Sequence, residues 1–249
     1  MVACEEIIHF LDNYLNSAQI TDASQNGLQV QGPHQIGKIA LGVSAGLEFF
    51  RRAKAYGAQL CIVHHGLLWG SGERLTGTFG ERVKYLFKND MGLAAYHLPL
   101  DMHPVIGHNA CLIQAVGAKD ITPFGNYHGQ TIGFKGRTDT SLSDLRARLE
   151  NYCQTQGNLL AYGKEHIQTV GIVSGGAWSM LSQAIEQKLD LYVTGALDEP
   201  AQELCREAQI NCLALGHYNS EKAGIIALGK LLQEKFPVET QFIEVANPL

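Results

Sequence analysis

The hydrophobic positions of the first half form short apolar runs that alternate with stretches of helical spacing. Three runs have the length and apolar content of buried strands: residues 39–43, 60–63 and 93–96. Residues 47–57 and 82–88 place their apolar side chains at helical spacing. Strands that alternate with helices in this way predict β-α-β units and a mainly parallel sheet.

The second half repeats this alternation. Its predicted strands are residues 169–173, 189–193 and 210–215. The turn Ser174-Gly175-Gly176 follows the first of them, and residues 178–185 and 200–208 have helical spacing. Residues 3–15 predict a further amphipathic helix rather than a signal peptide.

Two alignments suggest that the second half is a copy of the first. A shift of 130 residues places Val43-Ser44 on Val173-Ser174. A shift of 120 residues places His97-x-x-x-Asp101 on His217-x-x-x-Glu221, at the ends of equivalent strands. Chance likeness between generic β-α-β units is the alternative, and the matched spacing from histidine to carboxylate favours duplication.

The predicted fold is therefore α/β, with two similar three-layer α/β lobes from an internal duplication and mainly parallel or mixed sheets. We expect the first lobe to span residues 1–122 and the second 123–249, with an exchange of elements between them left open.

Composition narrows the class of protein. The 249 residues are 45% hydrophobic and 17% charged, as in ordinary soluble globular proteins. The net charge is −5 and the densest basic stretch is Arg51-Arg52, so a nucleic-acid partner is not expected. The six cysteines form no C-x-x-C pair, which is typical of reduced thiols in a cytoplasmic protein. No apolar run approaches the length of a membrane span.

The candidate chemistry lies where the strands end. Six side chains gather there: His64, His65, His97, Asp101, His217 and Glu221. Imidazole and carboxylate are the ligands that divalent zinc, manganese, iron, cobalt or nickel bind in proteins. Because a carboxylate can bridge two ions roughly 3.5–4 Å apart, this number of donors suggests two metal ions per chain. Two such ions beside two carboxylates keep an excess positive charge, which suits an anionic substrate and metal-assisted hydrolysis.

The stretch CIVHHGLLW (61–69) carries two of these donors in adjacent positions. Neighbouring side chains point to opposite faces of a regular strand, but Gly66 allows the chain to turn directly after the pair. The plainer interpretation is that one histidine caps a turn and the other is buried and hydrogen-bonded.

Other polar residues have ordinary structural interpretations. His103 and His108 fit a loop or a helix start, and Asp22 and Asn26 fit turn chemistry. The Ser174-Gly175-Gly176 turn either cradles an anion or supplies the small residues that a strand-to-helix turn needs. Four histidines are not accompanied by a group of other candidate ligands, and we expect them on the surface: His9, His34, His128 and His166.

The chain resembles the Nif-three-like dinuclear metal-binding family, also known as GTP cyclohydrolase I type 2 homologues. Five stretches carry the resemblance in the family's order: SAQITDASQNGLQVQG (17–32), CIVHHGLLW (61–69), YHLPLDMHPVIGHNA (96–110), GIVSGGA (171–177) and LGHYNSEKAGIIAL (215–228). They cover nearly the whole chain, and HHG, HxPLD and GHxxxE together are specific. The loop expected at residues 119–140 and the helix in the 150s are less telling.

The resemblance implies a ligand set and an assembly. The ligands it implies are His64, His65, Asp101, His217 and Glu221, with Glu221 reaching both metals between the two lobes. By the same resemblance, His97 lines the site or orients a ligand or bound water, and six chains form a toroidal hexamer.

The leading hypothesis is a dinuclear metal-dependent hydrolase of a nucleotide-like anionic small molecule, with ring-opening GTP cyclohydrolase activity as the candidate. Its cofactors would be two divalent ions per chain, of iron, manganese, zinc or nickel, and His97 and Glu221 its catalytic residues. One alternative is a non-catalytic, metal-dependent scaffold or partner-binding ring. A further alternative is a phosphodiesterase or nuclease that uses the same ions.

Overall fold

The structure, a computed structural model, describes residues 1–248, which divide into two compact units. Unit 1 contains Met1–Leu100 and Ile225–Ala246. Unit 2 contains Asp101–Gly224, with residues 247–248. The chain passes from unit 1 to unit 2 within α4 (Leu98–Met102) and returns within α10 (Ala223–Lys235).

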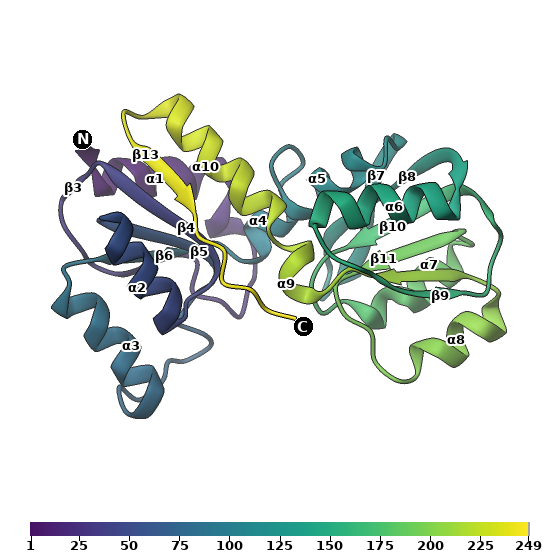
Figure 1. The fold of residues 1–249 in the computed structure, drawn as a ribbon, viewed down its shortest axis with the longest axis horizontal. Helices are drawn as coiled ribbons and strands as arrows, with labels where there is room; N and C mark the ends of the chain where they lie inside the picture. Colours follow the sequence, from purple (N-terminus) through teal and green to yellow (C-terminus); the bar gives the residue numbers. More distant parts are fainter. Residues whose placement is uncertain (249) are drawn as a thin grey trace. The chain divides into compact units, whose positions relative to one another are not determined.

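Unit 1 is built around a five-stranded sheet. Its elements besides α4 and α10 are β1 (Val2–Ala3), α1 (Cys4–Tyr14), η1 (Ser17–Gln19), β2 (Gly27–Val30), β3 (Gln35–Ile36), β4 (Lys38–Ser44), α2 (Leu47–Tyr56), β5 (Leu60–His65), α3 (Gly77–Lys88), β6 (Gly92–Ala95) and β13 (Glu239–Phe242). The strand order is β13-β4-β5-β6-β2, in which β2 runs antiparallel to β6 and the other pairs are parallel. Helices α2 and α3 cover one face of the sheet and α1 and α10 the other (Figure 1).

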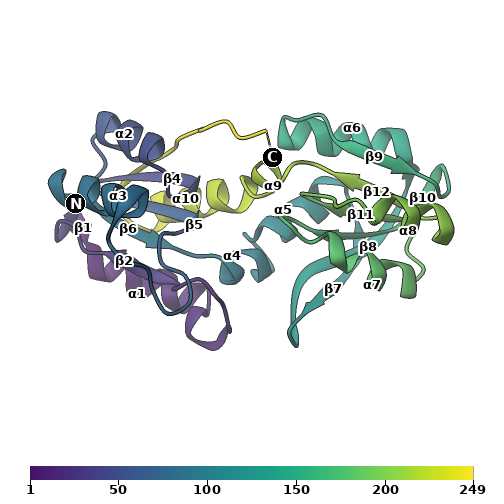
Figure 2. The same cartoon turned by 90° about the horizontal axis from the view of Figure 1, so that it is seen from below.

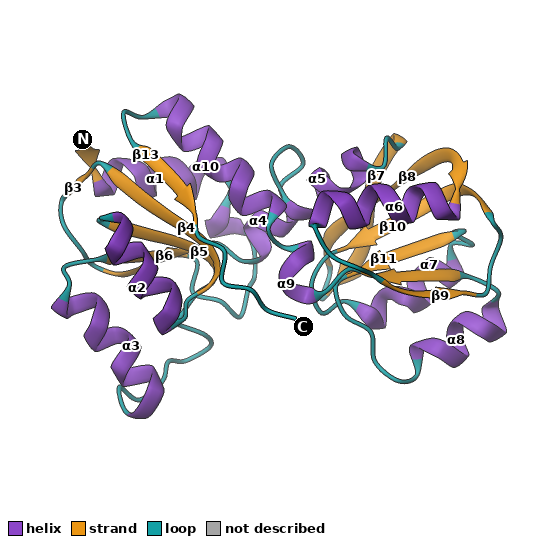
Figure 3. Ribbon diagram, viewed as in Figure 1, coloured by secondary structure: helices purple, strands orange, loops and turns teal. Residues whose placement is uncertain are grey.

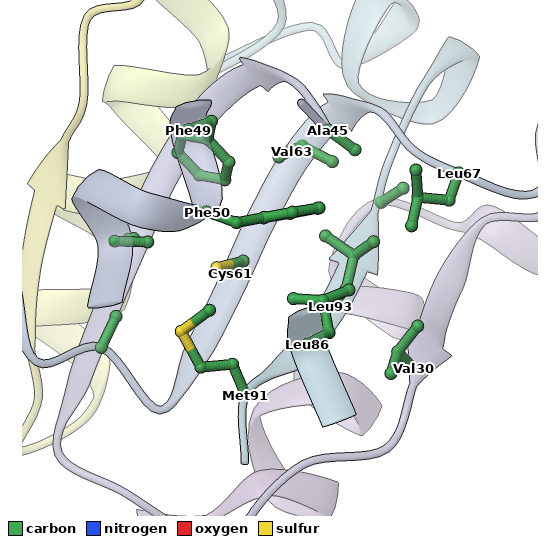
Figure 4. Close-up of a cluster of buried hydrophobic side chains, with 14 of the residues drawn as sticks. Val30, Ala45, Phe49, Phe50, Cys61, Val63, Leu67, Leu86, Met91 and Leu93 are labelled. Atoms are coloured by element: carbon green, nitrogen blue, oxygen red, sulfur yellow. The ribbon is translucent and has the colours of Figure 1, made fainter. Parts of the chain in front are cut away.

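The α2–α3 face of unit 1 carries a large hydrophobic core (Figure 4). Phe49 and Phe50 of α2 pack there against Cys61 and Val63 of β5. Because strand side chains alternate between faces, Leu60 and Ile62 point toward the helices of the opposite face, where they are also fully buried. A strand buried on both faces reads as a continuous apolar run, which is why residues 60–63 were recognisable in the sequence.

Unit 2 is built around a six-stranded sheet. Its elements are α5 (His108–Ala115), β7 (Lys119–Tyr127), β8 (Gln130–Ser141), α6 (Leu142–Cys153), β9 (Asn158–Ala161), β10 (His166–Val173), η2 (Trp178–Met180), α7 (Leu181–Glu186), β11 (Leu191–Thr194), α8 (Ala201–Ala208), β12 (Asn211–Ala214) and α9 (His217–Ser220). The strand order is β7-β8-β10-β11-β12-β9. Strands β10, β11 and β12 are parallel, whereas β8 and β9 pair antiparallel to their neighbours. Helices α5 and α6 lie on one face of this sheet and α7 and α8 on the other (Figures 2 and 3).

The predicted α/β class with mainly parallel or mixed sheets is confirmed, because the sheet of unit 1 is mainly parallel and that of unit 2 is mixed. Both sheets contain three adjacent parallel strands flanked by an antiparallel strand, β4-β5-β6-β2 in unit 1 and β10-β11-β12-β9 in unit 2. This shared order agrees with a duplication, which stays a prediction. The boundary expected at residues 122/123 falls inside β7, and unit 1 additionally takes residues 225–246.

Two segments differ from the sequence interpretation. Residues 119–140, treated as a loop, form most of the β7–β8 hairpin, and the helix placed in the 150s is α6, which ends at Cys153. The hairpin was not recognised because residues 119–123 of β7 are all exposed, so the strand lacks an apolar run.

The remaining sequence expectations concern thiols and membranes. The six cysteines are thiols rather than disulfides, as expected. None of the helices within residues 1–248 combines the length and apolar character needed to cross a bilayer.

A buried carboxylate fastens the start of β11 to β10 in unit 2. The Asp190 side chain accepts hydrogen bonds from the backbone N–H groups of Gln168 and Thr169, the Thr169 hydroxyl and the Lys164 ammonium, all at 3.0 Å. Burial by itself would raise the pKa of Asp190, but these donors outweigh it and hold the pKa below the ordinary value of 3.8. The ionised carboxylate therefore stabilises the fold.

We expect Asp190→Ala to lower the free energy of unfolding by about 3 kcal/mol at pH 7, because the backbone N–H groups of Gln168 and Thr169 and the Thr169 hydroxyl lose their acceptor. A carboxylate whose pKa is depressed in the folded state stabilises above its unfolded pKa and loses this effect as the pH falls through the folded pKa. The deficit should therefore shrink below pH 3.8, and urea denaturation of variant and wild type at several pH values would measure it. The exposed Asp139→Asn is the control; an equal deficit there, or one independent of pH, would contradict the assignment.

Candidate metal centre

Three histidines of unit 1 come together at the ends of two neighbouring parallel strands. His64 and His65 are the last residues of β5, and His97 follows β6 directly before α4. The ring centroid of His64 lies 4.6 Å from that of His65 and 5.0 Å from that of His97, and the centroids of His65 and His97 are 5.6 Å apart. One ring nitrogen from each of the three lies within 4.8 Å of the others. The three candidate imidazoles therefore form one cluster.

Strand β5 continues through both histidines, whereas the sequence interpretation ended it at Val63. The chain turns at Gly66, where a Cβ atom would lie 2.5 Å from the Ala95 side chain and the Gln29 amide. The same Gln29 amide oxygen accepts the backbone N–H of Leu67 at 2.7 Å and of Leu68 at 3.1 Å. Glycine is required here because the backbone approaches β2 and β6 closely.

Backbone and hydroxyl groups hold the first two rings. His64 Nδ1 lies 3.0 Å from the Tyr96 carbonyl oxygen, and His65 Nδ1 lies 3.4 Å from Ser44 Oγ. A carbonyl only accepts, so Nδ1 of His64 carries the hydrogen and Nε2 carries the lone pair. This is the tautomer that binds a metal through Nε2.

His97 is held by a loop that the sequence interpretation treated as turn chemistry. Its Nδ1 donates to Asp22 Oδ1 at 2.9 Å, and its backbone N–H donates to Asn26 Oδ1 at 2.7 Å. The same Asp22 carboxylate accepts the backbone N–H of Leu98 at 2.9 Å and of Ser24 at 3.0 Å. Asp22 and Asn26 therefore do form a local turn, and they also fix the backbone and ring of His97.

The environment keeps Asp22 ionised. Its side chain is only 2% exposed, and this burial by itself would raise its pKa. The hydrogen bonds that Asp22 accepts from His97, Asn26 and Ser24 outweigh burial and lower the pKa of Asp22 to about 2. An ionised carboxylate only accepts, so Nδ1 of His97 also carries the hydrogen.

Trp69 forms an aromatic wall beside this cluster. Its ring centroid lies 5.0 Å from that of His97, edge to face, and 6.3 Å from that of His65. Its indole N–H donates to the Gly66 carbonyl at 3.0 Å, which fixes the ring. Sequence analysis did not single out Trp69, and its presence in CIVHHGLLW was the available signal.

The donors of unit 2 surround the turn at residues 174–176. Asp101, in α4, is buried and accepts the Ser174 hydroxyl at 3.3 Å. Asn109, fully buried in α5, accepts the Ser174 backbone N–H at 2.7 Å and donates to the Ile132 carbonyl at 2.8 Å. These contacts fix Asp101 and the turn to each other.

His217 and Glu221 lie at the two ends of α9, and His217 Nε2 is 3.3 Å from Glu221 Oε2. The Glu221 side chain is 4% exposed and that of His217 41%. Gly175, with φ of +69°, packs so closely that a Cβ atom there would overlap the Glu221 carboxylate. The Gly175 backbone N–H donates to Ser220 Oγ at 3.0 Å, so the turn's amides serve the fold, which favours the structural interpretation of this turn.

The other histidines divide between structural and surface positions. His103 accepts the backbone N–H groups of Val105 and Ile106 at 3.2 Å, as a loop residue does. His108 is fully buried at the start of α5 and accepts the Gly224 N–H at 3.1 Å, and it also lies within 4.8 Å of the Asp101 carboxylate. Nothing in the sequence distinguished His108 from a helix-start residue. His166 pairs with Asp139 at 2.9 Å on the surface.

The chemistry of the two donor sets fits first-row divalent metals. Unit 1 carries the three imidazoles, and unit 2 carries two buried carboxylates and the His217 imidazole around a turn in which Gly175 leaves room for Glu221. The five residues expected as ligands, together with His97, all belong to these two sets.

We expect Gly175→Ala to destabilise the protein by about 1–2 kcal/mol from its left-handed backbone alone, and to lower metal affinity by displacing Glu221. Gly176→Ala is the matched control, because a Cβ there would meet only the His217 ring, at 3.5 Å. Urea denaturation and metal titration of both variants would measure the two effects. Equal behaviour of the two variants would show that the close packing at Gly175 is unimportant.

Comparison with known proteins places the chain in a family. The family model Duf34/NIF3 (NGG1p interacting factor 3) matches residues 2–248. A protein of Archaeoglobus fulgidus named GTP cyclohydrolase 1 type 2 homolog is 36% identical over 246 residues, or 98% of each chain. A protein of Chlamydia pneumoniae with the same name is 37% identical over 250 residues, again 98% of each.

Solved structures agree with this assignment. A protein called ybgI, described as of unknown function, superposes with a TM-score of 0.91 at 32% identity over the whole of both chains. TTHA1606 from Thermus thermophilus superposes with a TM-score of 0.92 at 31% identity, also over both entire chains. The chain therefore belongs to the Duf34/NIF3 family.

Proposed function

We propose that this protein is a dinuclear metal-dependent hydrolase of a nucleotide-like, anionic small molecule, with ring-opening GTP cyclohydrolase activity as the candidate reaction. The observation that carries the proposal is the gathering of imidazole and carboxylate donors at strand ends in both units. The name of the relatives, GTP cyclohydrolase 1 type 2 homolog, supports the nucleotide substrate.

In this proposal five residues bind two divalent ions per chain: His64, His65, Asp101, His217 and Glu221. Glu221 would be the residue that serves both ions, because a carboxylate offers two oxygens. The room that Gly175 leaves beside the Glu221 carboxylate supports this role. The mixture of nitrogen and oxygen donors suits iron, manganese, zinc or nickel.

When bound, such ions lower the pKa of a water ligand toward about 7 and offset the charge of an anionic substrate. The protein's own contribution is to orient the groups that move protons. His97 is suited to this task because Asp22 holds its Nδ1–H, which leaves the Nε2 lone pair to accept a proton and later return it. Glu221 would be the second catalytic residue, through the ions that it helps to hold.

The metal content of the protein is the first measurement that tests this proposal. Elemental analysis of protein prepared without chelators should find about two ions per chain, and fewer in Glu221→Ala. Glu203→Ala, which removes an exposed carboxylate paired with Arg206, is the matched control and should retain both ions. Fewer than about half an ion per chain after loading with manganese, iron, zinc or nickel would contradict the metal site.

Turnover separates a hydrolase from a metal-dependent scaffold. The loaded wild type should consume GTP with loss of the guanine C8–H signal in proton NMR, and Glu221→Ala should be at least about 100-fold slower. Full activity of Glu221→Ala with both ions bound would contradict the mechanism. If no member of a broad nucleotide panel is turned over while metal removal disrupts assembly, the scaffold function replaces the hydrolase function.

We also propose that six chains assemble into a toroidal hexamer and that the protein acts in the cytoplasm. The resemblance to the family supports the assembly, and the six cysteine thiols agree with a reducing compartment. Light scattering during size-exclusion chromatography should give about six times the 27.2 kDa mass of one chain. A monomeric mass for the metal-loaded protein would contradict the ring.

A further inference from the structure

We propose that Trp69 is the platform on which the planar base of the substrate stacks, and that this contact makes the protein select purine nucleotides over anions without an aromatic ring. The inference rests on the proposed function and deepens it, because it names the part of a nucleotide that the protein recognises besides the phosphates. The donor side chains of that function account for the binding of ions and the transfer of protons, and none of them accounts for the choice of a base.

The indole of Trp69 is not part of the hydrophobic core. Leu67, which is 3% exposed, belongs to the core cluster on the α2–α3 face of unit 1, and Leu68 packs against that cluster. Trp69 comes next in the chain, but it is partly exposed and does not belong to this cluster within the described residues 1–248. A large aromatic ring that is only partly buried keeps apolar surface that a ligand can cover.

The structure holds this ring in one orientation. Trp69 forms an isolated antiparallel bridge with Ser24, and the N–H of the next residue, Gly70, donates to the Ala23 carbonyl at 2.8 Å. The indole N–H donates to the Gly66 carbonyl at 3.0 Å. A ring fixed at both its backbone and its edge loses little conformational freedom when a ligand stacks on it, which favours binding.

The hydrogen bond to Gly66 also limits what the indole can offer a ligand. Tryptophan has a single donor and no acceptor, and in Trp69 that donor already faces the Gly66 carbonyl. The flat π surface remains, and it binds another planar ring by stacking, whatever hydrogen-bonding groups that ring carries. Trp69 is therefore suited to an aromatic base and not to a phosphate or a sugar hydroxyl.

Trp69 lies beside the two partly exposed histidines of unit 1. Its ring centroid is 5.0 Å from that of His97, with an angle of 70° between the planes, and 6.3 Å from that of His65. Interacting aromatic rings in proteins have centroids about 4.5–7 Å apart. A base at that distance on the His97 side of the indole lies next to the imidazole that the proposed function assigns to proton transfer. Stacking on Trp69 would thus hold the reacting ring of the substrate beside His97.

The segment that follows Trp69 packs against little of the protein. Residues 70–78 are all exposed. Gly70 and Gly72 have φ of +53° and +101°, and a Cβ atom at either position would meet no atom within 4 Å. A segment with so few packing contacts can adjust its backbone without disturbing the core. It can therefore accommodate a base as large as a purine beside Trp69.

Tryptophan fluorescence measures the stacking directly. The chain contains two tryptophans, so Trp178→Phe in the full chain leaves Trp69 as the only one. In this variant GTP should quench the emission in a saturable manner, and inorganic triphosphate, which has no ring, should leave it nearly unchanged. UTP should bind about 3–10-fold more weakly than GTP, because its ring is smaller. Binding of GTP without quenching, or equal quenching by inorganic triphosphate, would overturn the inference.

Calorimetric titration separates stacking from a structural role. Trp69→Ala should weaken GTP binding about 10–100-fold and change the affinity for inorganic triphosphate less than about twofold. Trp69→Phe keeps an aromatic ring and should bind GTP within about fivefold of the wild type. Phe87→Ala is the matched control, because it removes an aromatic side chain of α3 that is 63% exposed, and it should alter neither affinity.

A contrary result has a definite meaning in this titration. If Trp69→Ala weakens the binding of GTP and of inorganic triphosphate equally, the indole only supports the neighbouring imidazoles and the inference is wrong. If Trp69→Ala does not fold, Trp69→Leu replaces it, because leucine keeps an apolar side chain but has no π surface.

The outcomes also distinguish this inference from the proposed function. If GTP is turned over but Trp69→Ala leaves the ratio of the GTP and triphosphate affinities unchanged, the hydrolase stands and the stacking platform is wrong. If GTP quenches Trp69 but no nucleotide is turned over, the platform stands and the hydrolase is wrong. If neither GTP nor UTP binds, both are wrong.

Discussion

The parallel register of the central strands is the constraint on which the donor arrangement depends. In unit 1, β5 is hydrogen-bonded between β4 and β6, and all three run in the same direction. Parallel strands end at a common edge, so the last residues of β5 lie beside the residues that follow β6. This is why His64 and His97 are neighbours although more than thirty positions separate them in the sequence. The same constraint in unit 2 places the turn after β10 next to the helix that follows β12.

The strand ends bring the histidines and carboxylates together, and buried polar partners then orient these side chains. The Tyr96 carbonyl and the Asp22 carboxylate can only accept, and each therefore fixes which nitrogen of its histidine carries the lone pair. In unit 2, Asn109 and Ser220 hold the turn against which Asp101 and Glu221 lie. Such partners matter because a free imidazole exchanges tautomers and rotates, whereas a held one keeps its donor atom in place.

Sequence reasoning recognised the central strands, and it singled out the histidines and carboxylates at their ends, for a common physical reason. A strand buried on both faces must be apolar throughout, and a polar residue at its end stands out against that background. It recognised neither the β7–β8 hairpin nor the edge strand β13, because exposed or half-exposed strands have mixed patterns. It also read Asp22 and Asn26 as a turn, since their short-range role was visible and their long-range one was not.

The sequence by itself therefore determined the α/β class, the order of the central elements and the kinds of donor that follow them, because periodicity and residue chemistry are local properties. Tertiary structure decided which distant groups meet. The contact between Asp22 and His97 joins residues 75 positions apart, and β13 pairs with β4 from the far end of the chain. It also decided why Gly175 must be glycine, since only the packing of α9 shows that a Cβ atom would overlap Glu221. Such contacts depend on how whole elements pack, and no local pattern encodes them.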